Sequence, residues 1–279
     1  MTGSHHEAYS QMFAADGTVL RHPDRPTPRY RPVRAVRSFQ ALIKDKEDTS
    51  LVFKIFESLP ASNFIDRVSS LTLSERGERL RATEPSLAEI LDDHVALRRT
   101  PQGSLAHAYC DFMEAEGLSA AGLVAEAERL GRPKYPDLVQ WFLERSRDTH
   151  DLFHILTGYG RDALGEQCVL LFTHGQAPSQ GHLLIGYAGA ANIRKMVKGS
   201  AAPIFGAVRQ AHRTGKGAPQ LMAYPIRELL ARPLAEVRAE MRIPDPSQYR
   251  ECHRIWQAEG LSPYDLLANK AAEPELLAA

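Results

Sequence analysis

The sequence has little cysteine, no long apolar run and no excess charge of either sign, and each absence excludes a class of protein. Three cysteines are spread over 279 residues without a Cys-x-x-Cys pair, which argues against a disulfide framework and a cysteine zinc site. No apolar stretch approaches the roughly 18 residues of a membrane-spanning helix. Lysine plus arginine equal aspartate plus glutamate at 34 each, and basic and aromatic residues do not interleave. We therefore expect reduced thiols, no membrane span and no nucleic-acid partner.

Strand signals are absent as well. The chain shows no sustained alternation of apolar and polar residues and no Asn-Gly hairpin turn, which are the usual signs of paired strands. Apolar residues recur instead at steps of three and four, as in the stripe Leu105, Tyr109, Phe112 and Met113. At 43% apolar residues the chain can fill a core. The sequence predicts an all-α fold, a single helical domain of about ten or more helices.

Proline and arginine mark the predicted boundaries. Residues 1–32 combine four prolines with several arginines and few apolar residues, which predicts a flexible segment. A solvated tail is the simpler interpretation, and a basic arm on anionic lipid is the alternative, at roughly 1 kcal/mol per basic residue. We expect the helical domain to span residues 33–245. Residues 246–279 would form a helical tail, because Pro244 and Pro246 interrupt the pattern.

The most informative stretch contains His150, Asp151 and His154, followed by Glu166. Histidines four apart share one helical face and can converge on one ion. A long helix beginning at residues 136–137 should carry them and end near Gly158. Asp162 can then cap a second helix, with Glu166 about one turn inside it. We expect two imidazoles and two carboxylates to face one point between two helices.

A simpler explanation is that the acidic residues of this stretch, Glu144, Asp148 and Asp151, solvate an exposed helical face. Against it, the neighbouring positions 152, 153, 155 and 156 are apolar nearly all round, which predicts a buried turn. Buried polar groups need partners, and a divalent cation would satisfy several of them at once. Two imidazoles with one or two carboxylates suit zinc, and equally iron(II) or manganese.

The motif resembles the coenzyme Q (ubiquinone) biosynthesis protein four family. The matching pattern is Arg-Asp-x-His-Asp-x-x-His-x-x-x-Gly from Arg147, ending in Gly-Glu at Glu166. Residues 101–109 are similar to the family's segment before the metal helix, and residues 232–238 to its C-terminal helix, so the resemblance covers roughly residues 33–245. One departure is Tyr224, where a tryptophan is common in the family.

The resemblance implies a metal held by His150, Asp151, His154 and Glu166, most simply Zn²⁺, with Fe²⁺, Mn²⁺ and Mg²⁺ as alternatives. It also implies a carboxy-lyase, or an oxidative decarboxylase, that acts at ring carbon one of a polyprenylated 4-hydroxybenzoate. Asp151 or Glu166 would move a proton as general acid or base. No flavin or nicotinamide motif is evident in the chain.

The polyprenyl tail of such a substrate requires an apolar slot. Residues 183–191, rich in small side chains, and residues 203–213 are the predicted walls of this tunnel, although plain core packing explains them more simply. The resemblance further implies peripheral membrane contact and other ubiquinone-biosynthesis enzymes as partners, and is compatible with a homodimer. The expected location is the cytoplasmic side of the inner membrane in a bacterium, or the matrix side of the mitochondrial inner membrane in a eukaryote.

Two other functions share parts of this pattern. A lipid-binding scaffold with a structural metal, organising other ubiquinone enzymes, would show every feature above. A helical phosphohydrolase of the His-Asp type would need a further upstream histidine and a downstream aspartate, for which His107 and Asp162 are available. That class leaves His154 and Glu166 unexplained, so it is the weaker alternative. Residues 215–217, Gly-Lys-Gly, lack the full spacing of a phosphate-binding loop.

Overall fold

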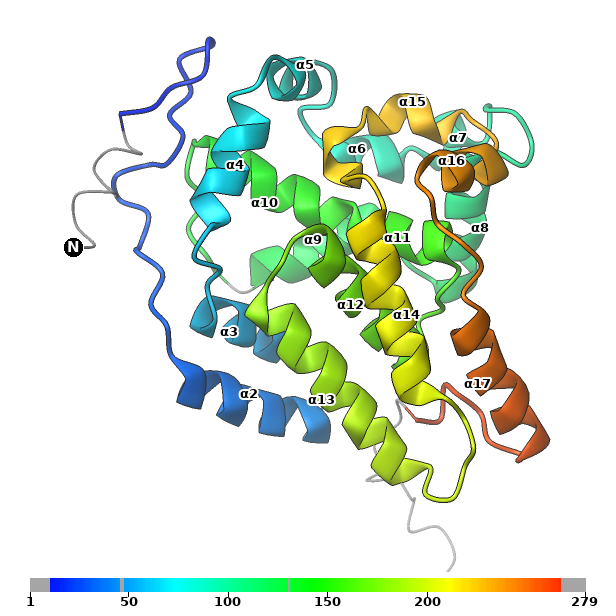
Figure 1. Cartoon of the computed structure of the whole chain (residues 1–279). Coiled ribbons are helices and arrows are strands. Elements are labelled where there is room, and N and C mark those ends of the chain that lie inside the picture. Colours follow the sequence, from blue (N-terminus) through cyan, green and yellow to red (C-terminus); the bar gives the residue numbers. More distant parts are fainter. Residues whose placement is uncertain (1–10, 46–47, 130, 267–279) are drawn as a thin grey trace, which may run out of the picture. The chain divides into compact units, whose positions relative to one another are not determined.

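The computed structural model describes residues 11–45, 48–129 and 131–266. These residues form helices and no β-strand, with two isolated bridges, so the predicted all-α class is confirmed. Figure 1 shows the course of the chain. The helices are α2 (Pro32–Lys44), α3 (Thr49–Ser58), α4 (Phe64–Thr72), α5 (Glu75–Thr83), α6 (Leu87–Asp92), α7 (His94–Leu97), α8 (Leu105–Glu116), α9 (Ala120–Arg129), α10 (Leu138–Asp148), α11 (His150–Thr157), α12 (Ala163–Gln176), α13 (Gln180–Met196), α14 (Ile204–Gly217), the 3-10 helix η1 (Leu221–Ala223), α15 (Ile226–Leu230), α16 (Leu234–Glu240) and α17 (Ser247–Ala258).

The helix ends follow local capping chemistry. Asp48, Asp137 and Asp162 each accept a hydrogen bond from a backbone N–H in the first turn of the following helix, which satisfies donors that a helix start leaves open. Gly117 and Gly158 end α8 and α11 in the left-handed conformation, with φ of 65° and 74°. The sequence alone indicated these starts and stops.

One local prediction was wrong. The long helix expected from residue 136 through the histidines divides at Thr149 into α10 and α11, and the Thr149 N–H bonds to the Arg145 carbonyl as the cap of α10. The highly charged stretch from Glu75 to Thr83 forms the helix α5. Ser74 caps it by accepting from the Gly77 N–H, and arginine and glutamate are good helix formers even without an apolar face.

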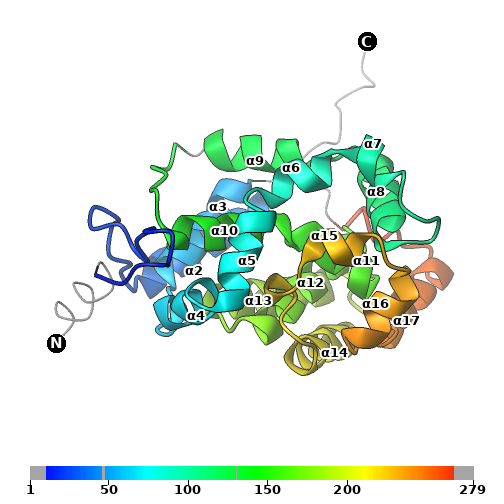
Figure 2. The ribbon, with the colours of Figure 1, turned by 90° about the horizontal axis from the view of Figure 1, so that it is seen from above.

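The chain forms two compact units. The first contains, among described residues, 11–28, 61–158 and 217–244. Its α4 packs against α10, around a core that includes Leu20, Val68, Leu138 and Phe142. Its α8 contacts α7, α11, α15 and α16, and Figure 2 shows α7 beside α8. Within this unit, α8 therefore lies among four other helices, one of which is the helix α11 that carries the motif histidines.

The second unit contains, among described residues, 29–60, 159–216 and 245–266. Its α2 and α3 pair with each other, and α13 contacts both of them as well as α12. Ala35, Leu42, Ile55 and Ile185 form part of its core. The C-terminal helix α17 belongs to this unit, although residues 246–279 had been expected to form a separate tail. The predicted boundaries at residues 32 and 245 stay predictions, and residues 1–10 and 267–279 lie outside the described part.

Small residues of α13 serve close helix packing. A Cβ atom added to Gly186 would lie 1.4 Å from the Leu171 Cδ2 atom of α12, and one added to Gly189 would lie 2.3 Å from the Gln167 Oε1 atom. Both contacts are far inside van der Waals distance, so a larger residue at either position would require the Leu171 or Gln167 side chain to move. This matches the core-packing explanation of residues 183–191, and the apolar tunnel stays a prediction.

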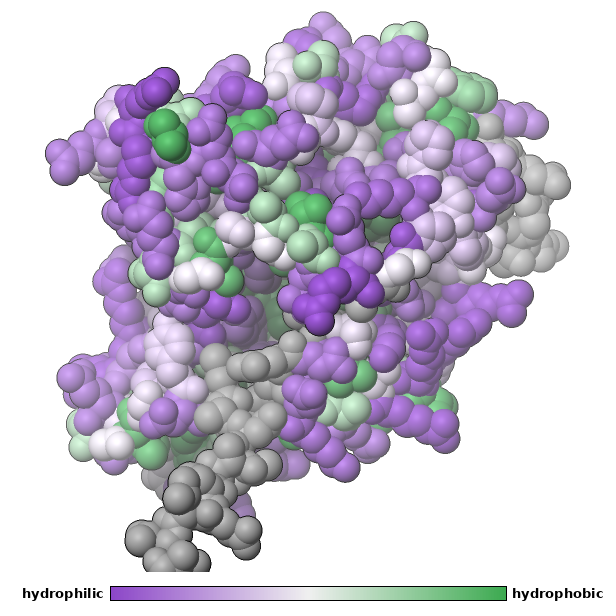
Figure 3. Space-filling model, turned by 180° about the vertical axis from the view of Figure 1, so that it is seen from behind, coloured by the Kyte–Doolittle hydropathy of each residue, from purple (hydrophilic) through white to green (hydrophobic). Residues whose placement is uncertain are grey.

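The surface carries no large continuous apolar area on the face shown in Figure 3, where hydrophobic residues form small groups among hydrophilic ones. Among the described helices, none combines the length and the apolar character needed to cross a bilayer. All three cysteines, Cys110, Cys168 and Cys252, are buried free thiols, as expected from their spacing.

Candidate metal centre

The two motif histidines occupy one face of the short helix α11. Their ring centroids are 5.1 Å apart and the ring planes are nearly perpendicular, at 79°. His154 is 2% exposed, whereas His150 is half-buried. Gly158 ends the helix directly after this face, and its N–H bonds to the His154 carbonyl. The local sequence therefore fixes both imidazoles at one short helix.

Glu166 lies in the first turn of α12, as its distance from the Asp162 cap predicted. The Asp162 carboxylate accepts hydrogen bonds from the N–H groups of Leu164 and Gly165, at 3.0 and 3.2 Å. The Glu166 side chain is 27% exposed, and one of its oxygens lies 3.7 Å from the Arg161 Nε atom. A carboxylate near a helix N-terminus is also favoured by the helix dipole.

The predicted ligands come from both units: His150 and His154 of α11 belong to the first, and Glu166 of α12 belongs to the second. That they meet at one ion stays a prediction. The donor set of two nitrogens and one carboxylate oxygen is one that zinc, iron(II) and manganese accept.

Asp151 of α11 was also predicted as a ligand. Its side chain is buried, at 9% exposure. The negative charge of Asp151 is the largest charge effect on Tyr109 of α8, whose pKa is raised first by burial and then by this charge. Asp151 thus acts electrostatically on α8, and its role as a ligand stays a prediction.

Helix α8 supplies two aromatic residues that sequence reasoning counted only as part of an apolar stripe. Phe112 stacks on the His154 ring, with centroids 5.5 Å apart and an interplanar angle of 22°. Tyr109 is fully buried, and its hydroxyl has no hydrogen-bond partner among the described residues. A buried unpaired hydroxyl is costly, so this one is a candidate donor to a bound molecule. The only signal in the sequence was a tyrosine at a core-facing position.

The other acidic residues of the motif do not form a solvated face. Asp148 is 5% exposed and accepts a hydrogen bond from the Arg147 Nε atom at 2.7 Å. Burial raises the Asp148 pKa, and Arg147 opposes that shift. Glu144 is half-buried. The exposed-face explanation is therefore wrong for Asp148 and Asp151.

Helix α17 supports the turn before Glu166. The Tyr249 hydroxyl donates to the Asp162 carboxylate and accepts from the Gly160 N–H at 2.9 Å. The His253 Nε2 atom lies 3.3 Å from the same carboxylate, which is buried. Burial raises the Asp162 pKa, but hydrogen bonds from His253 and Tyr249 outweigh it, so the pKa is lowered overall.

The residues required by the phosphohydrolase alternative have structural roles. The His107 Nε2 atom lies 2.9 Å from the Thr100 carbonyl oxygen and 3.2 Å from that of Arg98. Asp162 caps α12 and binds Tyr249. Both are thus engaged with their own unit, which leaves this alternative without its additional ligands.

Comparison with known proteins agrees with the motif. A family model described as "Coenzyme Q (ubiquinone) biosynthesis protein Coq4" matches residues 32–247. The mitochondrial ubiquinone biosynthesis protein COQ4 of Arthroderma otae is 28% identical over 230 residues, which cover 81% of this chain and 82% of the relative. The mitochondrial COQ4 homolog 2 of Culex quinquefasciatus is 26% identical over 152 residues, or 54% of this chain and 65% of the relative.

A solved structure shows the same fold. A protein of Nostoc punctiforme assigned to ubiquinone biosynthesis superposes with a TM-score of 0.54, over 77% of this chain and 100% of that chain, at 18% identity. The match to the family model spans more than half of the sequence and includes all four motif residues. The chain therefore belongs to the Coenzyme Q (ubiquinone) biosynthesis protein Coq4 family.

Proposed function

We propose that this protein acts in ubiquinone biosynthesis and removes the carboxylate at ring carbon one of a polyprenylated 4-hydroxybenzoate. Two facts support the proposal. The chain belongs to the Coq4 family, and the rings of His150 and His154 lie together on one face of α11, with centroids 5.1 Å apart. This histidine pair is the observation that carries the chemistry, since an ion held by the two imidazoles and the Glu166 carboxylate would keep a position open for substrate.

The metal would be held by His150, His154 and Glu166, and Asp151, the other predicted ligand, would bind it only when substrate does not occupy the remaining position. Zinc is the simplest occupant, and iron(II), manganese and magnesium are the alternatives. When bound, such an ion supplies a Lewis acid that polarises an oxygen atom of the substrate. Phe112, stacked on His154, fixes the plane of that imidazole and excludes water from one of its faces.

The protein's own carboxylates would deliver the proton that replaces the substrate carboxylate on the ring. In a simple decarboxylation the bond between ring carbon one and the carboxylate carbon breaks, carbon dioxide leaves, and the electron pair stays on the ring. One proton must then reach ring carbon one. Asp151, which is buried beside Tyr109, and Glu166 are the candidates to deliver it. The phenol oxygen para to this carbon makes the ring electron-rich and so favours protonation there.

An oxidative reaction would give a different product. A hydroxyl at ring carbon one would take one oxygen atom from dioxygen, and an added two-electron reductant together with two protons would convert the second oxygen atom to water. Incubation under labelled dioxygen separates the two reactions, because the label enters the ring only in the oxidative one. Both products lack the carboxylate, so both support the proposed class of reaction.

The polyprenyl substrate implies work at a membrane surface, and α2 presents a suitable face. Val33 and Val36 are 63% and 47% exposed, and Arg37 beside them is also exposed. Exposed apolar and basic residues on one helix favour peripheral binding to anionic lipid. The relatives named above are mitochondrial by name. Flotation with phosphatidylserine vesicles tests this, with a charge-reversing Arg37→Glu variant as comparison.

The test of the reaction uses the full chain, purified, loaded with zinc or iron(II), and supplied with a prenylated 4-hydroxybenzoate. Mass spectrometry should find a product that has lost the mass of carbon dioxide. His154→Ala should lose both metal and product. His212→Ala, which alters a half-buried histidine of α14, is the matched control and should retain both. Full metal and full product in His154→Ala would show that the site is assigned wrongly.

A non-catalytic scaffold that organises other ubiquinone enzymes is the alternative. It predicts no turnover by the purified wild-type protein under any metal, together with restored ubiquinone production when the gene is supplied to deficient cells. His154→Ala would then fail in cells although no enzyme activity existed to lose. Affinity capture with tagged wild type and His154→Ala would show whether the metal residues control association with those enzymes.

A further inference from the structure

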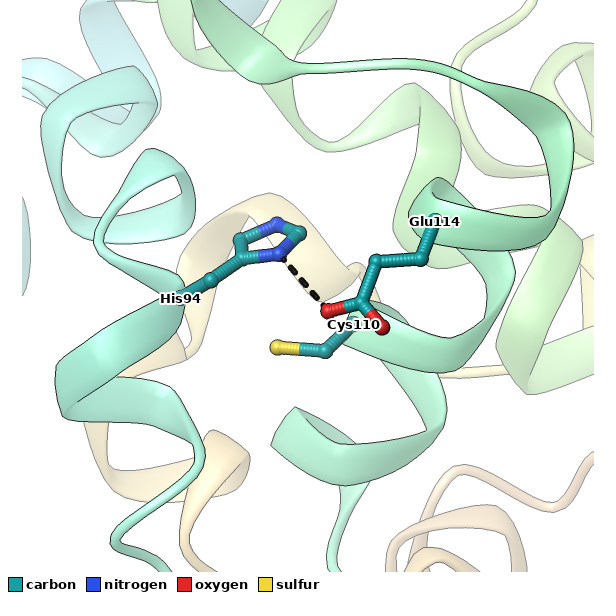
Figure 4. Close-up of side chains that lie close together, drawn as sticks. All are labelled: His94, Cys110 and Glu114. Carbon is teal, nitrogen blue, oxygen red and sulfur yellow. Dashed lines mark hydrogen bonds and ion pairs between the residues drawn. The ribbon is translucent and has the colours of Figure 1, made fainter.

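A second grouping of metal-ligand side chains lies in the first unit, on α7 and α8. His94 is the first residue of α7, which starts there because the Asp93 carboxylate accepts from the Ala96 N–H at 2.9 Å. Cys110 and Glu114 are four residues apart and share one face of α8. Figure 4 shows the three side chains pointing toward one another across the gap between the two helices.

The distances suit a single small ion. The Nδ1 atom of His94 lies 3.3 Å from the Oε1 atom of Glu114, close to the separation of about 3.4 Å between nitrogen and oxygen ligands of tetrahedral zinc. The ligand atoms of His94, Cys110 and Glu114 all lie within 4.8 Å of one another. Cys110 is fully buried, whereas the side chains of His94 and Glu114 are 25% and 55% exposed.

We propose that His94, Cys110 and Glu114 bind a zinc ion, with a fourth position open to water. Nitrogen, sulfur and carboxylate oxygen are the three donor types that zinc takes in proteins. The sulfur donor argues against magnesium and calcium, which prefer oxygen alone. The exposed sides of His94 and Glu114 leave the ion a path from solvent to the buried sulfur.

The neighbouring charges are arranged for a cation. Arg98 donates from Nη2 to the Oε2 atom of Glu114 at 2.8 Å and from Nη1 to Asp111 at 2.6 Å. The bond to Arg98 occupies one carboxylate oxygen of Glu114 and leaves the Oε1 atom directed at His94. A hydrogen bond of this kind orients a metal ligand. With a Cys110 thiolate, the three acidic groups exceed the one arginine by two negative charges. A divalent ion neutralises that excess.

The site would fasten α7 to α8. Between Cys110 and Glu114, α8 also carries Phe112, which stacks on His154 of α11, and Tyr109 precedes Cys110. Tyr109 in turn meets the His94 ring edge to face, with centroids 5.9 Å apart. An ion at this place therefore holds the helix that lies against the motif histidines, without contributing to their ligand set.

Cobalt(II) titration of the metal-free, full-length protein tests the proposal. A cobalt ion bound by a thiolate gives an intense near-ultraviolet charge-transfer band, whereas a site of histidine and carboxylate gives none. The band should be complete within about two equivalents of cobalt, because the motif histidines would take up the other equivalent without contributing to the band. Cys110→Ser should abolish it, and Cys252→Ser, which alters another buried thiol, should not. His154→Ala should keep the band, so this result is independent of the proposed enzyme site.

Glu114→Gln tests the same site without changing a buried residue, because the Glu114 side chain is largely exposed. It should weaken cobalt and zinc binding at the band-forming site by about tenfold or more. Asp111→Asn removes the other acidic partner of Arg98 and should leave affinity within about threefold. A wild-type protein without the band, or a band that survives Cys110→Ser, would overturn the zinc site and leave His94 and Glu114 as a simple ion pair.

Discussion

The Tyr249 hydroxyl donates a hydrogen bond to the buried carboxylate of Asp162, although 87 positions separate the two residues. Asp162 is the N-cap of α12, so this bond links α17 to the start of the helix that carries Glu166. The same hydroxyl accepts from the Gly160 N–H. The turn at residues 159–162 is therefore held from both sides, and Glu166 takes its position from a residue of the C-terminal helix.

Tyr249→Phe should destabilise the protein and weaken metal binding together. The change removes one hydrogen bond from the buried Asp162 carboxylate and leaves the Gly160 N–H without its partner, which costs about 1–3 kcal/mol. Denaturant unfolding and zinc titration would measure the two effects. Tyr187→Phe, at a half-buried tyrosine of α13 in the same unit, is the control and should change neither. Equal zinc affinity in Tyr249→Phe and wild type would show that α17 supports the fold but not Glu166.

Asp162 should make stability depend on acid pH. Its folded-state pKa is lowered below 3.8, because hydrogen bonds from His253 and Tyr249 outweigh the effect of burial. A depressed pKa contributes stability that is present above the unfolded value of about 3.9 and is lost as pH falls through the folded value. The gap in unfolding free energy between wild type and Asp162→Asn should therefore shrink below about pH 4. Urea unfolding across a pH series measures it, and a constant gap would contradict this account.

The helix ends and the spacing of the motif could be predicted because both depend on nearby residues. Asp162 caps α12 through bonds to residues two and three positions away, and Gly158 ends α11 through its own backbone. Histidines four apart must share a face of any helix that contains them. The places of His150 and His154 on one face of α11, and of Glu166 in the first turn of α12, thus follow from helical geometry and one short turn.

The remaining features depend on residues far apart in the chain. Nothing in the sequence near Tyr249 indicates that its hydroxyl binds Asp162, and periodicity cannot specify that the charge of Asp151 on α11 raises the pKa of Tyr109 on α8. The His94 site was missed for the same reason, because its ligands come from two helices and share no motif. A stripe of apolar residues predicts that α8 is buried but not which helix covers it.

The buried ion pair of Glu84 and Arg145 should be the most sensitive charged contact of the first unit. Their side chains are 1% and 2% exposed and lie 2.8 Å apart, and Arg145 also donates to the carbonyls of Met222 and Tyr224. Arg145→Met should cost about 3–5 kcal/mol, because it leaves a buried carboxylate unpaired. Thermal or denaturant unfolding measures the loss.

The exposed pair of Arg34 and Glu57 is the control for that prediction. Both side chains are more than 40% exposed and lie 3.5 Å apart, so Arg34→Met should cost less than about 1 kcal/mol. A double variant, Glu84→Leu with Arg145→Met, should recover part of the loss seen in Arg145→Met, since it removes the unpaired charge. A double variant less stable than either single one would contradict this.

Gly215→Ala should disturb the packing of α14 on α12. A Cβ atom there would lie 2.1 Å from the carbonyl oxygen of Phe172, a backbone atom that cannot turn aside. The expected loss is about 1–3 kcal/mol of unfolding free energy. Gly217→Ala, at the end of the same helix, meets nothing within 4 Å and should be neutral or up to about 1 kcal/mol more stable. Equal behaviour of the two variants would contradict the close contact.

Tyr109→Phe separates packing from function at the α8 face. The Tyr109 hydroxyl is buried without a hydrogen-bond partner among the described residues, so its removal should leave stability unchanged or raise it by about 1 kcal/mol. If the hydroxyl donates to substrate beside Asp151, decarboxylation should fall by about a hundredfold or more while bound metal is kept. Unfolding, elemental analysis and product formation are measured on one preparation, and unchanged turnover in Tyr109→Phe would show that the hydroxyl has no part in the reaction.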